Sequence, residues 1–223
     1  MNNLPNNNIQ VGNQMSRQTL RVSAVALPRV GAAKSDILIV TDESSSMSES
    51  CLGGTTRMAA AKAAAAGFAN VKSKLDPMGR VGIMGFSDSV RIVLPFTSAS
   101  ELPKIRNATD SLSERGGTDI TAGLLEAHRV FSANEVGGSR FVLLLTDGQH
   151  QGTEDPVAAA DGLKRIGVEI FAVGFASTAS EVDPRLPQIA SSGKYLFCDS
   201  LDQLLKQFEN ISQRTSIRQS HNQ

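Results

Sequence analysis

The sequence predicts an α/β fold of the three-layer, doubly wound, Rossmann-like kind, with a mostly parallel central sheet, one antiparallel edge strand and helices on both faces. Short runs rich in Ile, Val and Phe alternate with longer segments of helical periodicity from residue 36 onward, which is typical of β-α units. Two of the runs, 37–40 and 141–145, are apolar at every position. Such runs indicate central strands that helices cover on both faces.

The length of 223 residues fits one large domain, and the division of the chain follows from its composition. Hydrophobic residues make up 40% and charged residues 20%, as in folded proteins. We expect a disordered, Asn-rich tail over residues 1–18, an edge strand and linker over 19–33, the main domain over 34–214, and a C-terminal tail over 215–223.

Six strands follow from the apolar runs and the turns that bound them. Ser87, Asp88 and Ser89 turn the chain tightly between two of these strands, so one of the two is the antiparallel edge strand. The apolar runs centred on 37–40 and 141–145 form the middle of the sheet. The predicted strands are 37–41, 80–86, 89–95, 141–146, 168–174 and 194–198.

Helical periodicity and capping residues define the main helices. The first covers about 56–75, and a later one, with Ile120 on its apolar face, follows Thr118 or Asp119 as cap. Asp155 and Pro156 begin another helix, and a capping box from Ser200 to Gln203 opens the last one, which continues through Ile211. The stripe that faces the sheet on the first helix comprises Ala61, Ala64, Phe68, Val71 and Leu75.

Charge, aromatic content and cysteine use exclude several classes of partner. Basic and acidic residues both number 22, aromatic residues make up 4% and Trp is absent, so we expect no nucleic-acid partner. The longest apolar runs are too short to cross a bilayer, and the amino terminus lacks the order of a signal peptide. Only Cys51 and Cys198 are present, which favours a cytoplasmic location without membrane contact.

Oxygen-bearing side chains occur in three short segments. Asp42, Ser44 and Ser46 follow the first strand, Thr118 follows paired glycines, and Asp147 closes the most apolar strand. Each segment alone is most simply a turn or a helix cap. Ligands of parallel sheets bind beyond the carboxyl ends of strands, and hydroxyl and carboxylate oxygens suit Mg²⁺. Together, the three segments therefore predict a metal site.

This order of motifs, Asp-x-Ser-x-Ser, then Thr after two glycines, then Thr-Asp-Gly, resembles the metal-ion-dependent adhesion site of von Willebrand factor A domains over residues 34–214. The resemblance implies that Ser44, Ser46 and Thr118 reach the metal directly or nearly so. It also implies that Asp42 and Asp147 bind the metal directly or through water. The expected ion is Mg²⁺, with Mn²⁺ or Ca²⁺ as alternatives, and its open position would take an Asp or Glu side chain of a protein partner.

Three functions remain open at this point. We expect a non-enzymatic interaction module without catalytic residues. The alternative is a metal-dependent, phosphatase-like hydrolase with Asp42 as nucleophile, although haloacid dehalogenase-like enzymes carry a second Asp where Ser44 stands. A third possibility is a scaffold that does not use the site. The resemblance to intracellular prokaryotic members implies an ATPase or a stress- or conflict-system component as partner.

Four neighbouring residues have simpler interpretations than a role at a metal. We expect Asp119 to cap a helix, Glu43 to lie in a solvated loop, His150 to be an ordinary loop histidine, and Cys51 to be an inert thiol. In the resembled family the last helix often moves when the metal contact changes. The apolar stripe of the last helix, which contains Leu204 and Phe208, is equally compatible with movement and with a fixed core helix.

Overall fold

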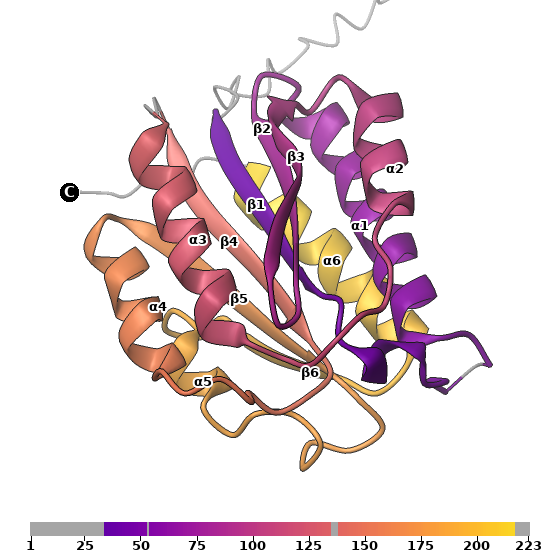
Figure 1. Cartoon of the computed structure of the whole chain (residues 1–223). Helices are drawn as coiled ribbons and strands as arrows, with labels where there is room; N and C mark the ends of the chain where they lie inside the picture. Colours follow the sequence, from indigo (N-terminus) through magenta and orange to yellow (C-terminus); the bar gives the residue numbers. More distant parts are fainter. Residues whose placement is uncertain (1–33, 53, 135–137, 217–223) are drawn as a thin grey trace, which may run out of the picture.

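The computed structural model describes residues 34–52, 54–134 and 138–216, and it has one six-stranded sheet in the order β3-β2-β1-β4-β5-β6 (Figure 1). All strand pairs are parallel except β2 with β3. The doubly wound fold with one antiparallel edge is thus confirmed. The expected tail over 1–18 and the edge strand and linker over 19–33 lie outside the described residues.

The strands agree closely with the apolar runs. The central pair is β1 and β4, as predicted, and β3 forms one edge of the sheet. β3 contains Pro95 and pairs with β2 through an irregular register. The bounds are β1 Ser35–Asp42, β2 Arg80–Phe86, β3 Val90–Ser98, β4 Ser139–Thr146, β5 Val168–Phe175 and β6 Tyr195–Cys198.

Helices cover both faces of the sheet and enclose two apolar cores. α1 (Arg57–Leu75), α2 (Leu102–Asp110) and α6 (Leu201–Ser216) pack on one face. α3 (Ile120–Ala133), α4 (Pro156–Arg165) and α5 (Leu186–Ile189) pack on the other (Figure 1). No helix among the described residues is both long and apolar enough to span a membrane.

The predicted stripe on α1 is correct at its centre and wrong at its end. Ala61, Ala64 and Phe68 are buried, but Leu75 is 43% exposed, and Lys72 is fully buried instead. Lys72 can take an interior position because its ammonium group pairs with Asp76, with Nζ and Oδ2 2.6 Å apart. A buried cation needs such a partner, and hydrophobic periodicity does not register it.

The predicted helix starts are largely confirmed. Asp119 caps α3 by accepting a hydrogen bond from the N–H of Ala122, and Asp155 caps α4 by accepting one from Val157. At α6, Gln203 accepts from the N–H of Asp199, one residue before the predicted capping box. α6 continues to Ser216, so the first two residues of the expected tail over 215–223 are helical; the remainder lie outside the described residues.

The strand register brings the predicted site residues to one edge of the sheet. Thr41 of β1 lies opposite Leu145 of β4, so the chain leaves both strands at the same level. Asp42 and Asp147 therefore emerge side by side at the carboxyl edge, which is the lower edge of the sheet in Figure 1. The short 3₁₀ helix η1 (Ser45–Ser48) follows β1 there.

Candidate metal site at the carboxyl edge of the sheet

The Asp42, Ser44, Ser46 and Asp147 side chains form one connected group. The Ser46 hydroxyl donates to Asp147 Oδ1 over 2.7 Å, and Ser44 Oγ lies 2.9 Å from Ser46 Oγ and 3.4 Å from the same Asp147 oxygen. The N–H of Ser44 donates to Asp42 Oδ1 over 2.7 Å. Segments about 100 residues apart in sequence thus meet through four oxygen-bearing side chains.

Asp42 is fully buried, and no cation of the described residues pairs with it. Its Oδ2 accepts a hydrogen bond from the Thr146 hydroxyl over 2.5 Å, and its Oδ1 accepts from Ser44 N–H. Burial raises the pKa of the Asp42 carboxyl to about 7, and the nearby Asp147 charge adds to the rise, while the Thr146 and Ser44 hydrogen bonds oppose it. Asp42 is therefore a buried acid whose ionised form has no counter-ion in the described part of the chain.

Asp147 differs because a protein cation lies beside it. Arg57 Nη1 donates to Asp147 Oδ2 over 2.9 Å. Burial raises the pKa of the Asp147 carboxyl, and the hydrogen bonds from Arg57 and Ser46 oppose that rise. Only Oδ1 of Asp147, the oxygen that accepts from Ser46, faces the serine hydroxyls.

Thr118 completes the group from the third segment. The residue is 2% exposed, and its hydroxyl forms no hydrogen bond with the described residues, although it is not one of the polar atoms that the fold seals from solvent. A Cβ added to Gly148 would lie 3.4 Å from Thr118 Oγ1 and 3.7 Å from Ser46 Oγ, so the two hydroxyls converge on the same point of the chain. The Thr118 hydroxyl therefore has no partner among the described residues and is available to a ligand.

These oxygens suit a hard cation. The group offers two carboxylates and three hydroxyls, and magnesium and calcium prefer oxygen ligands of these kinds. Within the described part of the chain no group of three or more His, Cys, Asp or Glu side chains is arranged so that it could hold a metal ion. A site that holds a metal here would therefore depend on hydroxyls for a majority of its protein ligands.

Backbone hydrogen bonds hold the three loops against each other. The N–H of Ser45 and its hydroxyl both donate to the carbonyl of Gly116 over 3.0 Å, and the N–H of Gln151 donates to the Thr118 carbonyl over 2.8 Å. Gly116 has φ of +61°, and a side chain there would collide with Asp88. Gly116, two residues before Thr118, thus permits the turn that brings the Thr118 hydroxyl to the site.

The expectation for Glu43 was wrong. Its side chain is 1% exposed, and Arg91 binds it through two hydrogen bonds of 2.6 and 3.0 Å. The reason is that Glu43 directly follows β1 and points toward the edge strand, where Arg91 supplies a charge partner. Glu43 therefore supports the loop and is not free to bind a cation.

His150 and Cys51 have structural roles. His150 Nδ1 accepts from the N–H of Ile120 over 3.1 Å, and Nε2 lies 2.8 Å from the Glu154 carbonyl. Cys51 is buried, and its thiol donates to the Thr55 carbonyl. Neither side chain contacts the oxygen cluster.

Arg57 and Thr146 are site residues that the sequence interpretation missed. Thr146 lies inside a motif that was chosen for Asp147, and nothing in the motif assigned it a bond to Asp42. For Arg57 a signal was present: it opens α1, where the helix dipole disfavours a cation. An arginine in a first helical turn indicates a nearby acid.

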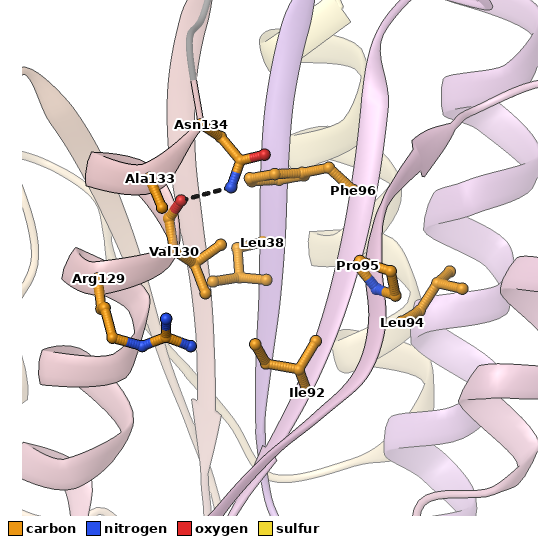
Figure 2. Close-up of a pocket in the computed structure, with 9 residues that line it drawn as sticks. All are labelled: Leu38, Ile92, Leu94, Pro95, Phe96, Arg129, Val130, Ala133 and Asn134. Carbon is orange, nitrogen blue, oxygen red and sulfur yellow. Dashed lines mark hydrogen bonds between the residues drawn. The ribbon is translucent and has the colours of Figure 1, made fainter.

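A hollow lies between β3 and α3, away from the oxygen cluster (Figure 2). Its volume is about 120 Å³, below the roughly 300 Å³ at which small-molecule sites begin. It is lined by apolar side chains such as Leu38, Ile92 and Phe96, and the only hydrogen bond drawn there is internal, from Asn134 to the Val130 carbonyl. It offers no convergent polar groups.

Comparisons with known proteins agree with this architecture. The family model described as von Willebrand factor type A domain matches residues 36–213. The mouse collagen alpha-4(VI) chain is 30% identical over 128 residues, which cover 56% of this chain and 5% of that one.

Two solved structures extend the comparison. The pilus adhesin SpaC of Lactobacillus rhamnosus GG aligns with a TM-score of 0.70 at 19% identity, over 83% of this chain and 31% of its own, and this likeness concerns the fold alone. Proximal thread matrix protein 1 of the mussel byssus, with a zinc-occupied MIDAS motif, aligns with a TM-score of 0.66 at 26% identity. The alignment covers 82% of this chain and 46% of the mussel protein. The chain spans less than half the length of each of these three proteins.

Proposed function

The chain belongs to the von Willebrand factor type A domain family, and on this premise we propose that it is a divalent-metal-dependent protein-interaction module. Asp42, Ser44, Ser46, Thr118 and Asp147 hold the ion, and Mg²⁺ is the proposed metal, with Mn²⁺ and Ca²⁺ as alternatives. When bound, the ion supplies an electrophilic position for a carboxylate. A protein partner completes the coordination with an Asp or Glu side chain.

The observation that carries this proposal is the state of Thr118 and Asp42. One is a hydroxyl of the oxygen cluster that makes no hydrogen bond, and the other is a fully buried carboxyl without a counter-ion, in both cases among the described residues. An ionised carboxylate that is buried without a counter-ion is costly. A cation held by this group would supply the missing charge, and the Thr118 hydroxyl would be free to bind it.

The mussel protein supports the choice of a metal, since its printed description gives a zinc-occupied MIDAS motif. Zinc accepts carboxylate oxygens, but Mg²⁺ and Ca²⁺ match hydroxyl donors better. The donor set of this chain contains no imidazole or thiolate, which favours the hard ions for this chain.

The phosphatase-like alternative has less support. A nucleophilic carboxylate needs an oxygen that can reach the substrate. Both oxygens of Asp42 accept hydrogen bonds, from Ser44 and Thr146, and the residue is fully buried. We therefore assign no catalytic residue, and we keep Asp42 as a residue that binds the metal directly or through water.

The partner class and location are proposals as well. An ATPase or a stress- or conflict-system component remains the proposed partner. Cys51 and Cys198 are free thiols, which suits the reducing cytoplasm, although the structural relatives include a pilus adhesin and a byssus protein.

The test is capture of partners from a native lysate with the immobilised chain in Mg²⁺ or in EDTA. We expect a partner to be bound in Mg²⁺, released by EDTA, and absent with Thr118→Val, which removes the hydroxyl and keeps the shape. Thr121→Val is the matched control, because that threonine bonds the Glu154 carbonyl and lies outside the cluster. Capture of a partner that persists in EDTA and with Thr118→Val would contradict the proposal.

A further inference from the structure

Arg57 forms ion pairs with three carboxylates beside the proposed metal site. Its Nη1 lies 2.9 Å from Asp147 Oδ2 and 3.1 Å from Glu49 Oε2, and its Nη2 lies 2.7 Å from Glu181 Oε2. The residue is 3% exposed, and its Nε atom is buried without a partner. The guanidinium group therefore joins the loops after β1, β4 and β5.

The position of this cation affects the proposed ligand Asp147 directly. Arg57 occupies Oδ2, so Asp147 presents only Oδ1 to the serine hydroxyls. The same interaction neutralises part of the carboxylate charge that would attract a metal ion. The guanidinium charge beside Asp147 also repels a cation in the site. This repulsion is strong because the surroundings are desolvated.

We propose that Arg57 is a built-in counter-ion that competes with the metal for Asp147. In the absence of metal it balances this buried carboxylate. In the metal-bound protein it weakens the hold of Asp147 on the ion, which leaves more of the ion's charge for the carboxylate of a partner. The inference rests on the proposed function, and it assigns to Arg57 the balance between metal affinity and partner affinity.

Removal of the Arg57 charge should change the two affinities in opposite directions. A metal ion meets less repulsion without the guanidinium group and binds more tightly. An added carboxylate then meets a site with less net positive charge and binds more weakly. Damage to the fold would weaken both steps, so the opposite signs separate a charge effect from a structural one.

The experiment titrates the full chain with Mn²⁺ and follows water-proton relaxation, and then titrates the Mn²⁺-loaded protein with acetate as the carboxylate probe. For Arg57→Gln we expect Mn²⁺ affinity to rise roughly fivefold or more and acetate affinity to fall by a similar factor. Arg57→Lys keeps the charge, so both affinities should stay within about twofold of the wild type.

Arg185→Gln is the matched control, because Arg185 lies at the same edge of the sheet but pairs with Asp183. It should leave both affinities within about twofold. Unchanged or weakened Mn²⁺ binding in Arg57→Gln, or an Arg57→Lys variant that behaves like Arg57→Gln, overturns the counter-ion role alone. A wild-type chain that binds no Mn²⁺ overturns the proposed function and this inference together.

Discussion

The two ends of β1 both bury carboxylates, but they balance the charge in different ways. At the amino end, Asp36 forms two hydrogen bonds of 2.6 and 2.7 Å with Arg80, and Asp76 pairs with Lys72 at 2.6 Å. At the carboxyl end, Asp147 pairs with Arg57, while the donors to Asp42 from the described residues are a hydroxyl and a backbone N–H group.

The difference lies in the charge partners, although the amino end also keeps one carboxylate oxygen, Asp76 Oδ1, buried without a hydrogen bond. Ser35 closes the amino-end cluster: its hydroxyl donates to the Thr215 carbonyl at the end of α6, and the Lys72 ammonium group donates to that hydroxyl. Each acid there has its own lysine or arginine. At the carboxyl end the charge of Asp42 and the hydroxyl of Thr118 have no such partner among the described residues. Four predictions test this comparison.

The largest effect is expected at the amino end. Lys72→Met leaves Asp76 buried without its cation, and breaking a buried pair in this way costs about 3–5 kcal/mol. Urea unfolding should show that loss. Asp76→Leu added to Lys72→Met removes both charges and should recover part of it. A loss below about 1 kcal/mol would mean that the amino-end cluster does not depend on its cation.

The second effect concerns an added metal. Mg²⁺ at about one hundred times its dissociation constant should stabilise the wild type by about 2.7 kcal/mol, measured by urea unfolding in Mg²⁺ and in EDTA. Thr118→Val should lose this gain because it lacks the hydroxyl ligand. If Lys72→Met is sufficiently folded, it should gain as much as the wild type, since its defect lies at the other end. A Thr118→Val variant that keeps the full gain would place the metal elsewhere.

The third effect is the pH dependence of that gain. The pKa of Asp42 is raised to about 7, above its unfolded value, so the metal-free fold is favoured by this group at low pH and loses that contribution as pH rises to about 7. Metal needs the ionised form. At a fixed Mg²⁺ concentration well above the dissociation constant at both pH values, stabilisation should therefore be about 1.4 kcal/mol larger at pH 8 than at pH 6. Thermal unfolding at both pH values measures it; equal gains would exclude Asp42 as a titrating ligand.

The smallest effect is expected at an ion pair that belongs to neither end. Glu126 and Arg129 pair on the exposed side of α3, where solvent screens the interaction. Glu126→Gln should change the free energy of unfolding by less than about 0.5 kcal/mol, with the same Mg²⁺ response as the wild type. A larger change would mean that exposed pairs matter here as much as buried ones.

The fold and much of the site at the carboxyl edge could be predicted from the sequence, because both depend on local patterns. Fully apolar runs identified β1 and β4, and two of the three polar motifs stood at strand ends, where topology brings them together, while the Thr118 motif preceded a helix. The charge partners could not be predicted in the same way. Glu43 and Arg57 are buried through contacts with residues 48 and 90 positions along the chain, and no periodicity or spacing reports those contacts. Lys72 pairs with Asp76 four residues on, a spacing that the sequence shows but that hydrophobic periodicity leaves out.

The irregular edge of the sheet has a consequence for how the protein meets other chains. Proline lacks the N–H group that a new strand would need, and β3 carries Pro95 and a broken register. At the other edge, β6 has four residues. Both borders are thus poor templates for strand addition, which protects the protein from edge-to-edge aggregation at high concentration.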